Sequence, residues 1–323
     1  MTHMSRLGVL TAMVAALVMN GVAAQAWPNK PVTVVTPLAA GTASDVAVRL
    51  IAEQLADSLH QAFIVENLPA ASGAVGAERV AQATPDGYTI CGCNNAILGV
   101  LPNLRKVCYD PAKSFRPVGM IAVLPTVLVV NPELPIKSVA DLIAYAKAKP
   151  GVLNYATGGP GSAQHIAMAL FIQATGVQLT HVPYKGASPA AVGVAGGEAG
   201  VMFNAVATVM PLVKAGKLRA IAVAGAERTP IMPELPTVAE SGVPGYDYAS
   251  WIGIVAPAAT PDAVVDKLAS ELTRVLKSPA TVKRLTDQGI DPFVLTPTKM
   301  AEYMATDYAR MTRVVKDAGM EAN

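Results

Sequence analysis

The sequence predicts an α/β protein built from two domains with a ligand cleft between them. Short apolar strands alternate with helical patterns along the chain, which is typical of an α/β fold with largely parallel strands. One extended run, 118–130, is longer than a usual strand and is broken by Pro125, so we expect it to leave one domain and enter the other. Two loops of small residues, one in each expected domain, connect a strand to a helix.

Composition supports a large folded core. The chain has 323 residues, of which 52% are hydrophobic and 15% are charged. This length is enough for two domains, and the low charge does not favour disorder. The formal net charge of +2 does not favour binding to nucleic acid.

Residues 1–26 have the pattern of a secretory signal peptide. Arg6 gives a positive start, an apolar run follows from Leu7 to Val22, and Ala24-Gln25-Ala26 fits a cleavage site between small residues. Cleavage there makes Trp27 the mature N-terminus. A single membrane anchor is the alternative, and Asn20 within the run favours cleavage.

The first strand-to-helix connection, Pro37 to Asp45, has the features of an anion site. It follows the apolar strand 32–35 and opens a helix to about Leu59. Thr42 and Asp45 have the spacing of a capping box, and free N–H groups at a helix start attract carboxylate or phosphate. An ordinary strand-to-helix turn is the alternative. The candidate ligand-binding residues here are Leu38, Ala40, Gly41, Thr42 and Asp45.

The next part of the chain predicts a strand near 62–66, a helix at 72–83 and a strand at 88–93. Two amides, Asn94 and Asn95, follow that last strand. Open α/β sheets bind ligands at the carboxyl ends of their strands, so both amides are candidates, although asparagine also favours turns.

Three cysteines leave two interpretations open. Cys91 and Cys93 lie two positions apart in a predicted strand and should point to the same face, whereas Cys108 follows later. In an oxidising compartment we expect Cys108 to pair with Cys91 or Cys93 and leave one free thiol. The alternative is that Cys91 and Cys93 are small buried hydrophobic residues.

The second loop, Gly158 to Ser162, is rich in glycine. It follows a predicted strand at 152–156 and precedes a helix at 163–174. It lacks the lysine of a Walker A motif and the third glycine of a dinucleotide fingerprint. Two such loops in two halves indicate a ligand held between domains. The candidates here are Gly159, Gly161, Ser162 and His165.

The remaining elements complete the two domains. Asn204, at the end of a strand at 200–203, is a further candidate. The chain from 226 to 249 is irregular, and we place the return crossing at its end. The expected domains are 27–125 plus 250–323 and 126–249. The other predicted elements are strands at 177–182, 218–224 and 251–255 and helices from 188 and at 206–214, 261–277, 279–288 and 297–317.

The sequence shows no pattern of enzyme chemistry. It has no Gly-x-Ser-x-Gly nucleophile elbow and no His-x-x-x-His metal spacing. His165 and His181 each have a structural interpretation as hydrogen-bonded residues near a loop. We therefore expect no catalytic residues, no metal and no cofactor.

Several blocks of the mature chain match a known family. The clearest is His181-Val182-Pro183-Tyr184-Lys185-Gly186, and others are Trp27-Pro28-Asn29-Lys30-Pro31, Pro85-Asp86-Gly87-Tyr88-Thr89, Gly159-x-Gly161-Ser162-x-x-His165 and Trp251-x-Gly253. With these blocks the chain resembles the extracytoplasmic solute receptors of tripartite tricarboxylate transporters, also called Bordetella uptake gene (Bug) receptors.

The resemblance implies a two-domain periplasmic binding protein, similar to type II, whose domains close about a hinge. It implies a monomer in the periplasm of a Gram-negative bacterium. Such a receptor holds a small carboxylate through backbone groups and bridging waters of the loops that match 37–45 and 158–162, and delivers it to the large and small membrane subunits of the transporter. Sensing for a two-component system is an alternative role, and an exported enzyme is another.

Three departures from the family pattern concern the ligand. Leu38 stands where the family usually has Phe, Thr42 where it has a second Gly, and Asn204 where it often has Asp. If Asn204 faces the ligand, the missing negative charge disfavours an ammonium group. We therefore expect a di- or tricarboxylate, or an aromatic carboxylate, without an amino group.

Overall fold

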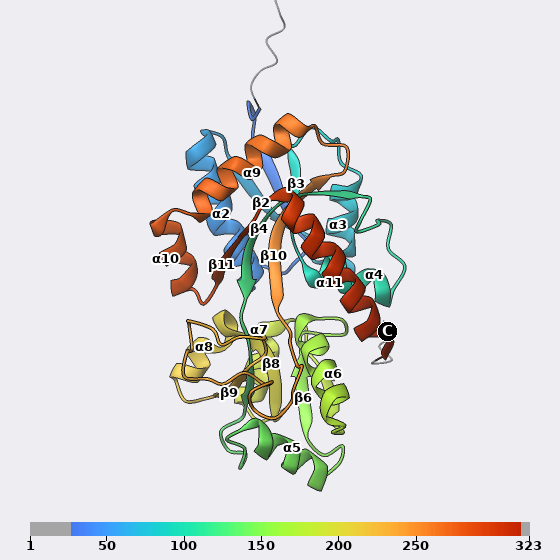
Figure 1. Cartoon of the computed structure of the whole chain (residues 1–323), viewed down its shortest axis with the longest axis vertical. Coiled ribbons are helices and arrows are strands. Elements are labelled where there is room, and N and C mark those ends of the chain that lie inside the picture. Colours follow the sequence, from blue (N-terminus) through green and yellow to red (C-terminus); the bar gives the residue numbers. More distant parts are fainter. Residues whose placement is uncertain (1–26, 318–323) are drawn as a thin grey trace, which may run out of the picture.

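The protein consists of two lobes, each built on its own β-sheet (Figure 1). The computed structural model describes residues 27–317, so the predicted signal peptide lies outside the described residues. We call the six-stranded sheet and its helices the first lobe, and the five-stranded sheet and its helices the second lobe. None of the helices in residues 27–317 is long and apolar enough to cross a membrane.

The sheet of the first lobe has the strand order β11-β4-β10-β3-β1-β2. Strand β1 pairs in parallel with β2 and β3, whereas β10 runs antiparallel to both β3 and β4, and β11 antiparallel to β4. The strands are β1 (Val32–Thr36), β2 (Phe63–Asn67), β3 (Thr89–Asn94), β4 (Phe115–Leu124), β10 (Ser250–Pro257) and β11 (Asp291–Leu295).

The sheet of the second lobe has the order β7-β6-β8-β5-β9. Strand β6 is parallel to β7 and β8, and β5 is antiparallel to β8 and β9. The strands are β5 (Thr126–Val130), β6 (Asn154–Thr157), β7 (Thr180–Pro183), β8 (Val201–Ala205) and β9 (Arg219–Val223).

Both sheets are mixed, so the expectation of largely parallel strands was wrong. One reason is β11, which pairs antiparallel with β4 at the edge of the first sheet. The other lies in the strands that cross between lobes. Strand β5 and strand β10 each enter a lobe from the crossing and run away from the interface, against their neighbours. The extended run 118–130 does divide at Pro125, into β4 and β5 of different sheets.

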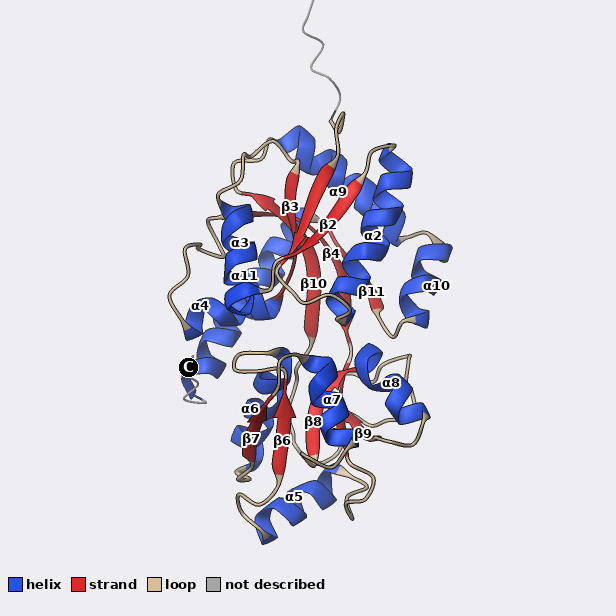
Figure 2. Cartoon of the chain, turned by 180° about the vertical axis from the view of Figure 1, so that it is seen from behind, coloured by secondary structure: helices blue, strands red, loops and turns tan. Residues whose placement is uncertain are grey.

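Helices cover both faces of each sheet (Figure 2). The predicted helix at 72–83 begins later, because Ala71 and Ser72 have positive φ and form a 3₁₀ turn, Ala70–Gly73. The helices are α2 (Ala43–Leu59), α3 (Ala74–Ala81), α4 (Leu101–Leu104), α5 (Val139–Ala148), α6 (Ala163–Thr175), α7 (Ala187–Ala195), α8 (Val206–Lys214), α9 (Asp262–Leu276), α10 (Pro279–Asp287) and α11 (Pro297–Asp317), with a π-helical turn at Ala96–Val100.

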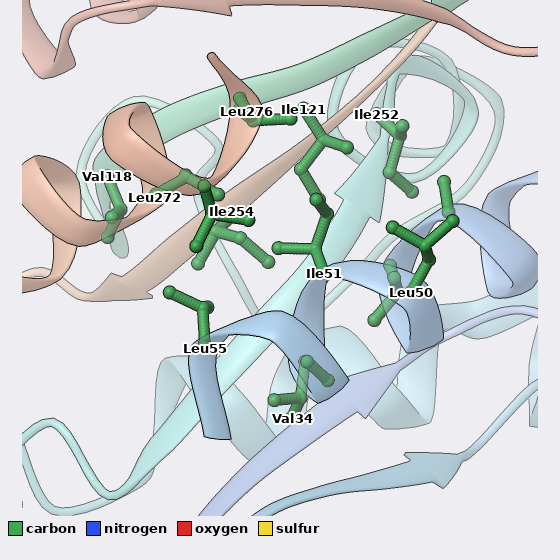
Figure 3. Packing of buried hydrophobic residues seen from close by; sticks show 14 of the residues in the cluster. Val34, Leu50, Ile51, Leu55, Val118, Ile121, Ile252, Ile254, Leu272 and Leu276 are labelled. Atoms are coloured by element: carbon green, nitrogen blue, oxygen red, sulfur yellow. The ribbon is translucent and has the colours of Figure 1, made fainter. Parts of the chain in front are cut away.

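One face of the first sheet packs against α2 and α9 (Figure 3). The predicted apolar stripe of α9 contributes Leu272 and Leu276, which meet Ile51 and Leu55 of α2. Each of these side chains is at least 99% buried, and full burial of one such side chain contributes roughly 1.5–3 kcal/mol. This packing fixes α2, and therefore the loop before it.

Helix α11 packs against both lobes. Its Met300 lies in the core of the first lobe with Trp251, whereas Met311 and Val314 lie in the core of the second lobe. Asp307 of this helix accepts a hydrogen bond of 2.9 Å from Nε1 of Trp251. The C-terminal helix is thus a third connection between the lobes, beside the two strand crossings.

The disulfide differs from the expected one. Cys91 is bonded to Cys93, with their Cα atoms 5.6 Å apart, and Cys108 is free and exposed. The expectation that Cys108 pairs with either residue was therefore wrong. Cys91 and Cys93 point to the same face of β3, as alternate residues of a strand do, and both are buried under α3, away from the exposed Cys108.

Candidate ligand-binding site

A cavity of about 480 Å³ lies between the two lobes. Its size is that of a pocket for a small molecule. It is lined by the ends of strands and the starts of helices from both lobes, namely Pro37, Leu38, Ala39, Thr42, Ala43, Ser44, Pro69, Ser72, Asn94, Ala96, Ile97, Leu101, Leu124, Thr126, Gly158, Gly159, Pro160, Gly161, Ser162, Ala163, Gln164, Lys185, Gly186, Ala187, Asn204, Ala205, Thr208 and Ser250.

In the loop from β1 to α2, Thr42 caps the helix as predicted, and the carboxylate of Asp45 binds back to the residue before the cap. The Asp45 N–H donates to Oγ1 of Thr42 at 3.3 Å, and the Gly41 N–H donates to Oδ2 of Asp45 at 2.9 Å. The N–H groups of Ala43 and Ser44, which lie between the cap Thr42 and Asp45, have no acceptor among the described residues. Both residues line the cavity.

Asp45 holds this loop from behind the cavity. Its side chain is 3% exposed and lies 3.0 Å from Nε of Arg49. Asn67 donates one hydrogen bond to Asp45 at 2.8 Å and another to the Leu38 carbonyl at 3.0 Å. Burial raises the pKa of Asp45, but hydrogen bonds from Asn67, Gly41 and Arg49 outweigh burial and lower this pKa below its usual value. Asp45 is therefore an ionised anchor of the loop.

The loop from β6 to α6 repeats this design in the second lobe. Oγ of Ser162 accepts from the His165 N–H at 3.4 Å, which caps the helix. The N–H groups of Ala163 and Gln164 have no acceptor among residues 27–317, and both residues line the cavity. Two helix starts, one from each lobe, thus present four N–H groups to one space.

Gly161 is required where the two lobes meet. Its φ of +73° is in the left-handed region, and a Cβ added there would lie 2.4 Å from Cδ1 of Leu104, in α4 of the first lobe. Only glycine combines this backbone with such a close approach.

His165 supports the loop rather than lining the cavity. Its Nδ1 accepts a hydrogen bond from the Gly161 N–H at 3.1 Å. Burial and the neighbouring His181 lower the pKa of His165 to about 4, so that the ring is neutral at pH 7.

The asparagines have different places. Asn204 is 1% exposed and lines the cavity; its Nδ2 donates to the Ala187 carbonyl at 3.0 Å, and its Oδ1 accepts from Nε2 of Gln164 at 3.2 Å. Asn94 lines the cavity, and its Oδ1 accepts from the Ile97 N–H at 3.2 Å. Asn95 lies behind, where it binds the start of β10 through the Ala249 carbonyl at 3.2 Å.

The structure therefore divides the predicted site residues into two groups. The first group lines the cavity and contains Leu38, Thr42, Asn94, Gly159, Gly161, Ser162 and Asn204. The second group lies outside the lining and contains Ala40, Gly41, Asp45, Asn95 and His165.

Sequence reasoning missed several polar lining residues. Ser44 and Gln164 follow the predicted caps Thr42 and Ser162 by two positions, so both could have been predicted from the positions of the caps. Among the described lining residues, Lys185 has the one charged side chain, and no hydrogen bond or ion pair joins it to another described residue. The turn pattern around Lys185 gave no sign that it faces the cavity. Ser72, Thr126, Thr208 and Ser250 were also missed.

No carboxylate side chain lines the cavity, within the part of the chain that the structure describes. No group of three or more His, Cys, Asp or Glu side chains in residues 27–317 is placed to hold a metal ion. The cavity therefore combines backbone donors, amides and one cation with apolar walls, which suits a small anion.

Comparison with known proteins agrees with this geometry. The model of the tripartite tricarboxylate transporter family receptor matches residues 47–320. The chain is 38% identical to the R. palustris protein Rpa4515, solved with adipate, with a TM-score of 0.86 over 91% of this chain and 99% of that one. It is 31% identical to the periplasmic binding protein BugD, with a TM-score of 0.83 over 92% and 100%.

A third similar structure is MatC (Rpa3494) from Rhodopseudomonas palustris with bound malate. The chain is 32% identical to it, with a TM-score of 0.81 over 90% of this chain and 100% of MatC. The family match spans most of the chain, and the fold of the neighbours covers nearly all of it. The chain belongs to the tripartite tricarboxylate transporter receptor family, the Bug-type periplasmic solute-binding proteins.

Proposed function

We propose that this receptor captures a small carboxylate between its lobes and delivers it to the large and small membrane subunits of a tripartite tricarboxylate transporter, without converting it chemically. One observation carries the proposal. Two opposed helix starts present the unpartnered N–H groups of Ala43, Ser44, Ala163 and Gln164 to one cavity whose described lining has no acidic side chain. Such helix starts favour anions.

The N–H groups alone do not supply the affinity of a receptor. Micromolar binding requires about 8 kcal/mol in total, and one helix start contributes roughly 0.3–2 kcal/mol. The remainder must come from burial of the ligand when the lobes close. Leu38, Ile97, Leu101 and Leu124 offer apolar walls for that burial.

We infer a ligand with one or more carboxylates and no ammonium group, a di- or tricarboxylate or an aromatic carboxylate. An ammonium group would find no carboxylate partner in the described lining. Asn204 stands in the wall as a neutral amide. The solved relatives hold adipate and malate, two dicarboxylates, which supports this ligand class.

We further propose that 27–125 with 250–323, and 126–249, move as two domains when the cavity closes. The lobes are joined by β4 to β5 at Pro125 and by the segment that leads into β10. We place the mature protein in the periplasm as a monomer, after cleavage behind Ala26. N-terminal sequencing of the exported protein should find Trp27 first.

A ligand panel tests the function. Protein should be unfolded, washed and refolded first, because a receptor can retain its ligand through purification. We expect thermal stabilisation and calorimetric binding with dicarboxylates, tricarboxylates or aromatic carboxylates. Stabilisation only by amino acids or neutral amides would contradict the proposed ligand class. Mass spectrometry of the same mixtures should recover each carboxylate unchanged, and turnover would instead indicate an exported enzyme.

A further inference from the structure

Two histidine rings lie face to face behind the glycine-rich loop Gly158 to Ser162. The rings of His165, from α6, and His181, from β7, have centroids 4.4 Å apart and planes 13° apart. The ring of Tyr155, from β6, lies 4.9 Å from His181 and 6.4 Å from His165. Three neighbouring elements of the second lobe thus contribute one aromatic cluster.

Both histidines are bonded to the loop that carries the helix start. Nδ1 of His165 accepts from the Gly161 N–H at 3.1 Å. Nε2 of His181 lies 2.6 Å from Oγ1 of Thr157, which in turn accepts from the Gly159 N–H at 3.1 Å. The loop therefore rests on two imidazoles, one at each end of its glycine-rich part.

This arrangement requires a neutral His165. A protonated Nδ1 has no lone pair to accept the Gly161 N–H, and two cationic rings at this separation would repel. The titratable groups that face His165 are Tyr155 from β6 and His181 from β7. No Asp, Glu, Lys or Arg side chain of the described residues makes a hydrogen bond or ion pair with either ring. Burial lowers the pKa of both histidines, and His181 lowers the pKa of His165 further.

We propose that His165, in its neutral form, and His181 are positioning residues of the carboxylate site, which hold the Gly159–Gly161 backbone so that the start of α6 faces the cavity. Protonation of His165 releases the Gly161 N–H and loosens the loop. The link to ligand rests on the proposed function, whereas the link to the loop does not.

Two variants of His165 separate the hydrogen bond from the titration. His165→Asn places an amide oxygen close to the position of Nδ1 and keeps an acceptor that does not titrate. His165→Leu removes the acceptor. His60→Asn is the control, because His60 ends α2 on the surface, outside the cavity lining.

The backbone amide of Gly161, followed by NMR without ligand, gives the first readout. We expect its proton shift in the wild type to follow the His165 titration, with a midpoint near the pKa of about 4. The transition should persist in His60→Asn and disappear in His165→Asn. At pH 7 the amide of His165→Leu should exchange with solvent at least about tenfold faster. A Gly161 amide that is the same in all four proteins would overturn the proposal.

Adipate binding by calorimetry at pH 7, where the ligand is fully ionised, gives the second readout. We expect His165→Leu to weaken binding roughly two- to tenfold, the effect of one lost hydrogen bond, and His165→Asn to recover most of it. Equal affinity of His165→Leu and the wild type would overturn the role in positioning the site. If the wild type binds no adipate, the same comparison is made with the carboxylate that binds best in the ligand panel. If no carboxylate of the panel binds, the ligand class is overturned, and the Gly161 amide alone decides the proposal about the loop.

Discussion

The two loops that face the cavity share one backbone design and differ in what holds them. Each follows a strand, caps a helix with a hydroxyl and leaves two N–H groups without an acceptor among residues 27–317. The first is anchored by the ionised Asp45 with Arg49 and Asn67, the second by neutral histidines. The difference shows that one backbone design can rest on a charged support in one lobe and on a neutral support in the other.

Removal of the charged anchor should have the largest effect. Asp45→Ala removes a buried carboxylate and leaves the Gly41 N–H and the half-buried amide of Asn67 without their acceptor, which should lower the free energy of unfolding by about 2–4 kcal/mol. Chemical denaturation measures this loss. Asp141→Ala is the matched control, because Asp141 has the same capping role on α5 at an exposed position. Equal losses in the two variants would show that Asp45 is only a helix cap.

The two anchors should fail at different pH. The folded-state pKa of His165 is about 4, below the usual 6.5, so the unfolded chain binds more protons between these values and stability falls as the pH falls through that window. The loss should be roughly 1–3 kcal/mol between pH 7 and pH 4. Asp45, with its lowered pKa, should lose its contribution only below its ordinary pKa of 3.8.

Denaturation curves at pH 7, 5.5 and 4 check this order. In His165→Asn the free energy of unfolding should change less with pH above pH 4, whereas His60→Asn should have the same dependence on pH as the wild type. A His165→Asn profile as steep as that of the wild type would show that another group causes the acid loss.

The glycines at the two loops should respond unequally. Gly41 and Gly161 both have left-handed φ, +77° and +73°, but an added Cβ meets nothing within 4 Å at Gly41 and Leu104 at Gly161. We expect Gly41→Ala to cost about 1 kcal/mol from backbone strain alone and Gly161→Ala about 2 kcal/mol. Adding Leu104→Ala to Gly161→Ala should recover part of the loss, measured as a double-mutant cycle. Additive losses would mean that the contact between the lobes does not matter.

The amides of the two lobes provide the finest comparison. Asn204→Asp adds a negative charge and removes the donor to the Ala187 carbonyl, so affinity for a carboxylate should fall about tenfold or more, or 1.4 kcal/mol. Asn94→Asp adds the same charge but keeps the acceptor for the Ile97 N–H, and should weaken binding less. Calorimetry with the best carboxylate of the panel measures both. Unchanged affinity in Asn204→Asp would remove Asn204 from the site.

The sequence allowed prediction where the determining signal is local. The hydroxyl cap at Thr42 and its partner Asp45 lie within four residues, and Thr42 caps α2 in the structure. The break at Pro125 was readable for the same reason. The neutral support of the second loop could not be predicted, because His165 and His181 meet only after β7 pairs with β6. The position of Lys185 in the lining and the strand β11 were not predicted either, because both depend on contacts between distant parts of the chain.

The helix that packs on both lobes has a consequence for affinity. Because Met311 and Val314 of α11 are buried in the core of the second lobe, any rotation of one lobe against the other changes the apolar area that α11 covers. The fraction of molecules that is competent to bind therefore depends on residues that never touch the ligand. A ligand that binds one arrangement only has its apparent dissociation constant divided by that fraction. Substitutions on α11 can thus tune how tightly this receptor holds its cargo while leaving its choice of cargo unaltered.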